Sequence, residues 1–82
     1  MAKRDTKAKR ERDGWRVVVD KAGEFAIASN TAWIEALAWK NGLVHINRSD
    51  RFPGLTPARA AQFAAKVAAI AARAAKEAKD GR

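Results

Sequence analysis

The feature that most constrains this chain is an uninterrupted helical segment near its C-terminus. Thr56 is a favourable N-cap, and Pro57 suits the first helical position, where its missing backbone N–H is not needed. No glycine or proline follows until Gly81. The sequence therefore predicts one helix over residues 57–79, about 34 Å long at about 1.5 Å per residue. Any fold of this chain must give so long a helix a surface to pack on.

At 100° per residue the predicted helix divides into three faces. The first is bulky and is expected to be core; it comprises Phe63, Val67, Ile70 and Ala74. The second is basic, and its cations recur every seven residues as Arg59, Lys66 and Arg73. Such a row suits phosphate contacts, although a solvated surface is the plainer interpretation.

The third face of the helix is built from alanine. Its members recur with the three–four spacing of a heptad: Ala61, Ala64, Ala68, Ala71, Ala75 and Ala78. Small side chains let two helix backbones approach closely, so this face predicts helix–helix contact, including a homodimer. Codon bias and helix propensity are the alternative explanation. Burial of alanine contributes little per residue, so such an interface needs further contacts.

Residues 15–29 alternate between apolar and polar side chains on both sides of Lys21-Ala22-Gly23, which predicts a β-hairpin. A three-residue loop closed by Gly23 would set Asp20 opposite Glu24. This register gathers one apolar face: Trp15, Val17, Val19, Phe25 and Ile27.

Residues 30–42 admit two interpretations. The favoured one is a helix that ends at Asn41-Gly42, because Ala, Glu, Leu and Lys favour helices and are depleted in strands. In the other, Asn41-Gly42 is a hairpin turn that sets Trp39 opposite Val44. The exposure of Trp39 distinguishes the two interpretations. The helix makes Trp39 an exposed contact residue, and the strand makes it a core residue.

The predicted fold is therefore a small α+β domain over residues 15–82. An antiparallel sheet, made of the hairpin and a short third strand at 43–47, is packed by the long C-terminal helix in the order ββαβα. The alternative is a four-stranded meander followed by that helix.

Positive charge is concentrated at the two ends of the chain. The net charge is +8, from 17 basic and 9 acidic residues. Residues 1–14 carry +3 with no large apolar side chain after Met1, so we expect a disordered basic arm. Residues 56–82 carry +4, and the stretch between carries +1. A basic excess of this kind attracts polyanions.

The first expected function is nucleic-acid binding without catalysis, with DNA favoured over RNA. Phosphates would meet the arm, the loop before the helix and the basic helix face; the candidates are Lys3, Arg4, Lys7, Lys9, Arg10, Arg12, Arg48, Arg51, Arg59, Lys66 and Arg73. Within this set, Arg48, Arg51 and Arg59 surround the helix N-terminus, which favours anions.

The alternative function is a protein-interaction module, either a small adaptor or an inhibitor of a larger host protein. Its contact residues would be an exposed aromatic side chain and the alanine face, namely Trp39, Ala61, Ala64, Ala68, Ala71 and Ala75. A homodimer through the alanine face is one form of this alternative.

The residue types suggest no catalytic, metal or cofactor site. The chain has no cysteine and one histidine, His45, so a typical zinc site is not expected. Phosphate-binding glycine loops, nucleophile elbows and paired carboxylates are also missing from the sequence. No stretch approaches the ~18 consecutive apolar residues of a membrane span. We therefore expect a cytoplasmic protein that is not an enzyme and has no membrane partner.

Overall fold

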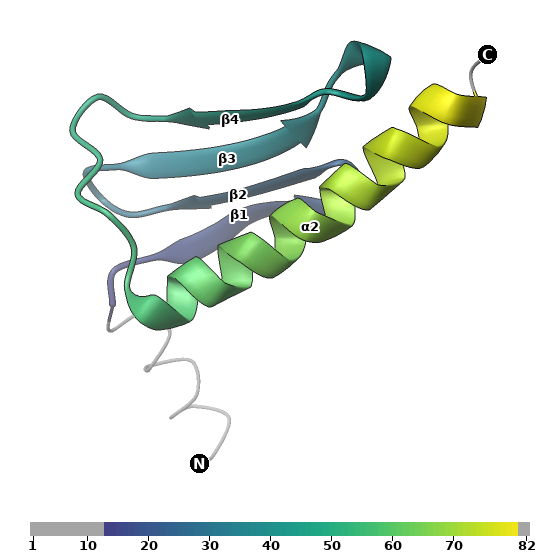
Figure 1. Cartoon of the computed structure of the whole chain (residues 1–82). Helices are drawn as coiled ribbons and strands as arrows, with labels where there is room; N and C mark the ends of the chain where they lie inside the picture. Colours follow the sequence, from purple (N-terminus) through teal and green to yellow (C-terminus); the bar gives the residue numbers. More distant parts are fainter. Residues whose placement is uncertain (1–12, 81–82) are drawn as a thin grey trace.

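The computed structural model describes residues 13–80, which form a four-stranded antiparallel sheet with one long helix across one face (Figure 1). The strands follow the chain in space: β1 (Arg16–Lys21), β2 (Glu24–Ala28), β3 (Trp33–Ala38) and β4 (Val44–Arg48). A short 3-10 turn, η1 (Lys40–Gly42), joins the last two strands, and α2 (Pro57–Asp80) follows β4. The α+β class and the meander are confirmed, whereas the order ββαβα is wrong.

The segment predicted as a helix over residues 30–42 is β3 and its flanking turns. The Ser29 hydroxyl accepts the Ala32 N–H at 3.1 Å, which closes a tight turn just before β3. β3 then lies between β2 and β4, with Ile34 and Ala36 exposed by 7% and 0%. Alanine suits this position because a small side chain lets α2 lie close to the sheet. Packing therefore overrides the helix propensity of this segment.

The β1–β2 hairpin forms as predicted, but its turn is shorter. Lys21 pairs with Glu24, so the loop is the two residues Ala22-Gly23, with Gly23 at a φ of 90°. The expected three-residue loop, with Asp20 opposite Glu24, is wrong. Glycine adopts a positive φ at no steric cost, which allows the tighter turn.

β1 is an edge strand, and its predicted apolar face is buried only in part. An irregularity between Val17 and Val19 restores the expected pairing of Val17 with Ile27. Ile27 in the central strand is 0% exposed, whereas Val17 is 40% exposed. The members of the predicted face that are fully in the core are Trp15, Phe25 and Ile27.

The turn between β3 and β4 is the Asn-Gly turn of the strand interpretation. Asn41 and Gly42 have φ values of 65° and 77°, and the Leu43 N–H donates to the Lys40 carbonyl at 3.3 Å. Positive φ at both central residues matches the twist of a hairpin, which is why Asn-Gly is favoured there.

The register of β4 is shifted by one residue from the predicted one. Ala38 pairs with Val44, where Trp39 was expected. A shift of one residue moves a side chain to the other face of the sheet. Trp39 is consequently not a core residue; it is 50% exposed and stacks on His45, with ring centroids 4.9 Å apart.

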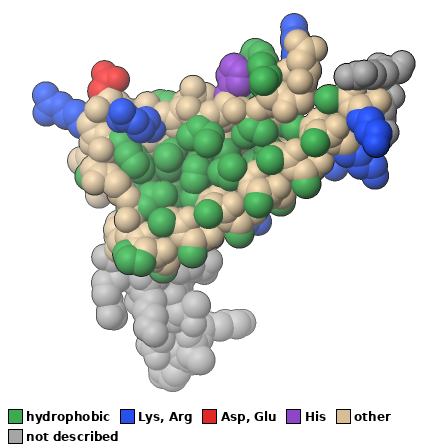
Figure 2. Space-filling view, viewed as in Figure 1, with side chains coloured by type: hydrophobic (Ala, Val, Ile, Leu, Met, Phe, Trp, Pro, Cys, Tyr) green, Lys and Arg blue, Asp and Glu red, His purple; other side chains and the backbone are tan. Residues whose placement is uncertain are grey.

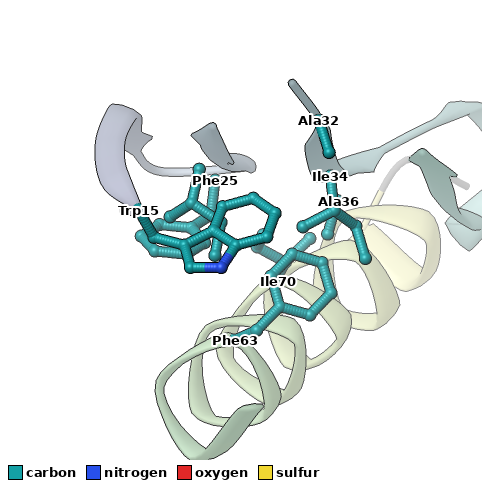
Figure 3. Close-up of a cluster of buried hydrophobic side chains, with 8 residues drawn as sticks. Trp15, Phe25, Ala32, Ile34, Ala36, Phe63 and Ile70 are labelled. Carbon is teal, nitrogen blue, oxygen red and sulfur yellow. The ribbon is translucent and has the colours of Figure 1, made fainter. Parts of the chain in front are cut away.

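The hydrophobic core lies between the sheet and α2, and side chains from β2 and β3 point toward Phe63 and Ile70 (Figure 3). The rings of Phe25 and Phe63 are 6.1 Å apart, and those of Trp15 and Phe52 are 5.9 Å apart. The predicted core face of the helix is confirmed, with three buried members and one half-buried: Phe63, Ile70, Ala74 and Val67.

The helix N-terminus is also as predicted. The Arg59 N–H donates to Thr56 Oγ1 at 3.2 Å. We expect Thr56→Ala to lower the free energy of unfolding by about 1 kcal/mol, because the cap acceptor is lost. Thr56→Ser keeps the hydroxyl and is the control. Urea unfolding followed by circular dichroism measures the effect, and equal midpoints for the two variants would contradict the cap.

Candidate interaction surface

α2 crosses the sheet diagonally (Figure 1). At its N-terminal end, Arg59 Nη2 donates to the Trp15 carbonyl at 2.8 Å, next to the start of β1. At its other end, Ala78 lies against Gly42 of η1, where an added Cβ would be 3.0 Å from the Ala78 Cβ. The helix therefore runs from the β1 edge to the β3–β4 turn, and part of the sheet face beside β4 is left uncovered.

The uncovered part of the sheet is apolar. Ile46 pairs with Ala36 and so points to the helix side, yet it is 54% exposed. Figure 2 shows apolar side chains filling the area between β4 and α2. We call this area the open sheet patch; it comprises exposed Ile46 and the half-buried residues Val44, Phe52 and Leu55.

The alanine face of α2 borders this patch. Ala64 and Ala71 lie on the same line of the helix as Ala78, which contacts the β3–β4 turn. On the opposite flank, Lys66 and Arg73 line a shallow pocket of about 410 Å³ beside the β1–β2 turn. The exposed alanines that extend from this line to the outer side of α2, away from the sheet, are named the alanine ridge: Ala61, Ala64, Ala68, Ala71 and Ala75.

The outer surface of α2 is unusually poor in polar side chains. Between Ala58 and Ala75, every polar or charged residue of α2 belongs to a single row: Arg59, Gln62, Lys66 and Arg73. Apart from Arg73, the exposed positions in this stretch are all alanine. A helix that borders water usually shows a wide polar face, and one that is apolar over most of its surface is usually buried.

The basic row predicted to meet phosphates is matched by carboxylates. Lys66 Nζ lies 3.0 Å from Asp20 Oδ1, and Arg73 Nε lies 3.2 Å from Glu77 Oε2. These pairs reduce the positive field along the helix. The cations of the basic row therefore have acidic partners within the domain. Binding of phosphate by this row stays a prediction.

Arg59 does not sit at an accessible phosphate site. It is 6% exposed, its Nε donates to Asp13 Oδ2 at 3.1 Å, and its Nη1 donates to Gln62 Oε1 at 2.7 Å. Together with the bond to the Trp15 carbonyl, these contacts tie the start of β1 to the first turn of α2. The inclusion of Arg59 among the nucleic-acid contacts is corrected, because burial closes its guanidinium to an external ligand.

Asp13 belongs to the folded domain, although the disordered arm was expected to reach Gly14. The Trp15 N–H donates to Asp13 Oδ1 at 3.0 Å. This backbone bond lowers the pKa of Asp13 below its ordinary value of 3.8; burial opposes the effect and Arg59 adds to it. Residues 1–12, with the remaining candidates Lys3, Arg4, Lys7, Lys9, Arg10 and Arg12, lie outside the described residues.

The lowered pKa of Asp13 predicts that the free energy of unfolding depends on pH in the acidic range. A carboxylate whose pKa is lower in the folded state stabilises the fold above its unfolded pKa, and this stabilisation is lost as the pH falls through the folded pKa. We expect Asp13→Asn to be less stable than the parent at neutral pH, and the difference to shrink below about pH 3.9. Urea midpoints measured at both pH values test this, and a difference that is independent of pH would contradict it.

The loop cations and the helix N-terminus do not form a closed anion site. Arg48 and Arg51 are both exposed, and Arg48 Nη1 donates to the Ser49 carbonyl at 3.3 Å. Arg59 is directed to Asp13 instead, and the Thr56 hydroxyl accepts from the helix backbone. The three arginines expected around the helix N-terminus therefore do not converge on one point.

Trp39 lies on the face of the sheet opposite α2, apart from the alanine ridge. It stacks on His45, which pairs with Leu37, whereas the neighbouring pair Ala36 and Ile46 faces the helix. Trp33 is also exposed, by 42%. The expected contact residues, Trp39 and the alanines, thus lie on two separate surfaces. The sequence analysis did not single out Ile46, because its exposure follows from the path of α2 across the sheet.

Among residues 13–80, no group of three or more His, Cys, Asp or Glu side chains could hold a metal ion. No helix there combines the length and apolar character needed to cross a membrane. Comparison with protein-family models, with curated proteins and with solved structures finds no match.

Proposed function

We propose that this chain is a protein-interaction module that binds its partner through the open sheet patch and the alanine ridge. The observation that carries the proposal is that both surfaces are apolar, exposed and adjacent. Large apolar areas on the surface of a small domain commonly mark interaction sites. Isolated exposed apolar residues need no such explanation, but Figure 2 shows a cluster of apolar side chains between β4 and α2, with further apolar side chains along the helix beside it.

The two parts of this surface would contribute differently to binding. The alanine ridge gives little energy per side chain, but it lets a partner backbone come close to α2. Ile46 is 54% exposed, so it has more apolar area to bury than any single alanine. The patch therefore supplies the energy that a contact through alanine alone would lack.

A capture experiment tests the proposal. Tagged chain is incubated with cell extract that has been treated with nuclease, so that proteins held only through nucleic acid are lost. Ala68→Glu places a charge in the ridge, whereas Ala69→Glu makes the same change one residue away, beside Lys66 and Arg73. We expect the parent and Ala69→Glu to retain the same proteins and Ala68→Glu to lose them. Equal capture by both variants would contradict the proposal.

Nucleic-acid binding is the second candidate function. Residues 13–80 contain ten Lys or Arg and seven Asp or Glu, so most of the net charge of +8 comes from the end segments. The sheet face opposite α2 also exposes Trp33 and Trp39, and aromatic side chains stack on unpaired bases. These two observations support contact with single-stranded DNA through the basic ends and that face.

A salt titration tests this second function. Quenching of tryptophan fluorescence by single-stranded DNA is measured at increasing salt. We expect the logarithm of the binding constant to fall linearly with the logarithm of the salt concentration, with a slope of about −0.7 for each phosphate that the protein neutralises. Trp39→Ala should weaken binding without changing that slope, because stacking releases no counterions. Absence of binding at low salt, or binding that salt does not change, would exclude this function.

Two further expectations stay predictions from the sequence. The chain is proposed to lack enzymatic activity, and a cytoplasmic setting is proposed for it.

A further inference from the structure

The open sheet patch is an apolar area that α2 leaves uncovered. β4 and the following connection present Ile46, Val44 and Leu55 on the same side of the sheet as α2, but α2 passes beside them. Arg48 is the only charged member of β4; it pairs with Ile34 and so lies on the helix side of the sheet, at the edge of the patch. The rest of the patch is apolar and requires an apolar occupant. The occupant must also be narrow enough to lie next to α2 on the same sheet face.

The outer surface of α2 itself fits this description. Away from the flank that carries Lys66, Ala69 and Arg73, its exposed positions between Ala58 and Ala72 are all alanine, so it offers a smooth apolar strip without long side chains. A second copy of the chain would bring such a strip to the patch. A twofold axis makes the exchange reciprocal, so that each copy's helix covers the other copy's patch.

The available area agrees with a dimer. From Ala58 to Ala75 the strip is about 26 Å long at about 1.5 Å per residue, and with a width of about 10 Å it offers about 260 Å². A contact buries about the same area on each of its two sides, so each copy would bury about 500 Å² and the pair about 1,000 Å², which is near the lower limit for a specific interface. Either surface alone falls short of this limit, whereas reciprocal contact reaches it.

The distribution of charge also permits contact between two like-charged copies. The basic row with Lys66 and Arg73 lies on the β1 side of α2, away from the patch, and is paired with Asp20 and Glu77. The surfaces that would meet hold no ion pair that must be broken. An interface of this kind is uncharged at its centre, as interface centres commonly are.

We propose that the occupant is a second copy, and that two chains form a symmetric dimer in which α2 of each lies between its own sheet and the open sheet patch of its partner. This inference rests on the proposed function, for which it names the partner. It also explains why α2 is apolar around most of its circumference. The helix is then an inner layer of the assembly, with a sheet on each side.

The mass of the purified full-length chain tests the inference. Light scattering and sedimentation equilibrium across the micromolar range should give twice the 8.9 kDa of one chain. Ala68→Glu and Ile46→Lys should each raise the dimer dissociation constant by about 100-fold, because each leaves an unpaired charge in an apolar contact. Ala69→Glu should change it by less than about 3-fold, since that charge lies next to paired cations. Circular dichroism confirms that the variants fold.

Three results would overturn the inference. The first is a parent chain that is monomeric at every concentration. The second is a dimer that Ala68→Glu and Ile46→Lys leave intact. The third is equal loss of the dimer in Ala68→Glu and Ala69→Glu. A monomeric parent that still captures nuclease-resistant partners, with Ala68→Glu unable to do so, would refute the dimer while upholding the proposed interaction function.

Discussion

Arg59→Ala is expected to lower the free energy of unfolding by about 3 kcal/mol. The side chain is 6% exposed and bonds to Asp13, Gln62 and the Trp15 carbonyl. Its removal leaves these acceptors without their donor, and loss of one partner of a buried charge pair costs more than the pair itself contributes. Small domains are stable by only about 5–15 kcal/mol, so the effect is a large fraction of the total.

Two comparison variants make this expectation specific. Arg59→Lys keeps the charge but loses the planar fork of donors, so we expect intermediate stability. Arg73→Ala removes an arginine from the same helix whose side chain is 53% exposed and paired with Glu77, so its cost should stay below about 0.5 kcal/mol. Urea unfolding measures all three. Similar losses for Arg59→Ala and Arg73→Ala would show that the buried network does not stabilise the fold.

Phe25→Ala should be the most destabilising core substitution, with an expected loss of about 3–5 kcal/mol. Phe25 is 1% exposed, its ring lies 6.1 Å from that of Phe63, and Lys66 Nζ lies 5.4 Å from its centroid. Deleting the ring removes its burial and leaves a cavity between the sheet and α2, which the surrounding residues fill only in part.

The loss of unfolding free energy in Phe25→Ala is compared with the losses in two milder substitutions. If Phe25→Ala does not fold, Phe25→Leu retains most of the volume and should lose about 1–1.5 kcal/mol. Val18→Ala removes apolar atoms from β1 at a position that is 51% exposed, so it should lose less than about 1 kcal/mol. A loss for Phe25→Leu no greater than that for Val18→Ala would contradict the placement of the core.

α2 was predictable because its signals are local. Thr56 and Pro57 determine where the helix begins, and the spacing of Phe63, Val67 and Ile70 determines which side faces the sheet. Each depends on residues within a few turns of one another. The observed bounds, Pro57–Asp80, therefore differ from the predicted ones by one residue.

β3 was not predictable in the same way, because its state depends on distant partners. Its alanines favour a helix in isolation, but β2 and β4 supply the hydrogen bonds that make it a central strand. The Asn41-Gly42 turn was a valid local signal for a hairpin. Its one-residue offset from the predicted register was not visible in the sequence, and that offset places Trp39 on the face opposite α2.

Of the two parts of the candidate site, the alanine ridge could be predicted from the sequence and the open sheet patch could not. The spacing of the alanines placed them on one face of α2, and the structure shows them exposed there. The open sheet patch could not be inferred, because it follows from the diagonal path of α2 across the sheet. That path depends on Arg59 at one end and on the contact of Ala78 with Gly42 at the other.

The most direct test of the interface is a cross-link between the ridge of one copy and the patch of another. The chain has no cysteine, so single substitutions can be labelled without background. Tagged Ala68→Cys and untagged Ile46→Cys are mixed, equilibrated and treated with a short bifunctional maleimide, and tagged Ala69→Cys replaces Ala68→Cys in the control. The account predicts a covalent dimer containing both chains in the first mixture and little in the second. Equal yields in the two mixtures, or no cross-link in either, would contradict it.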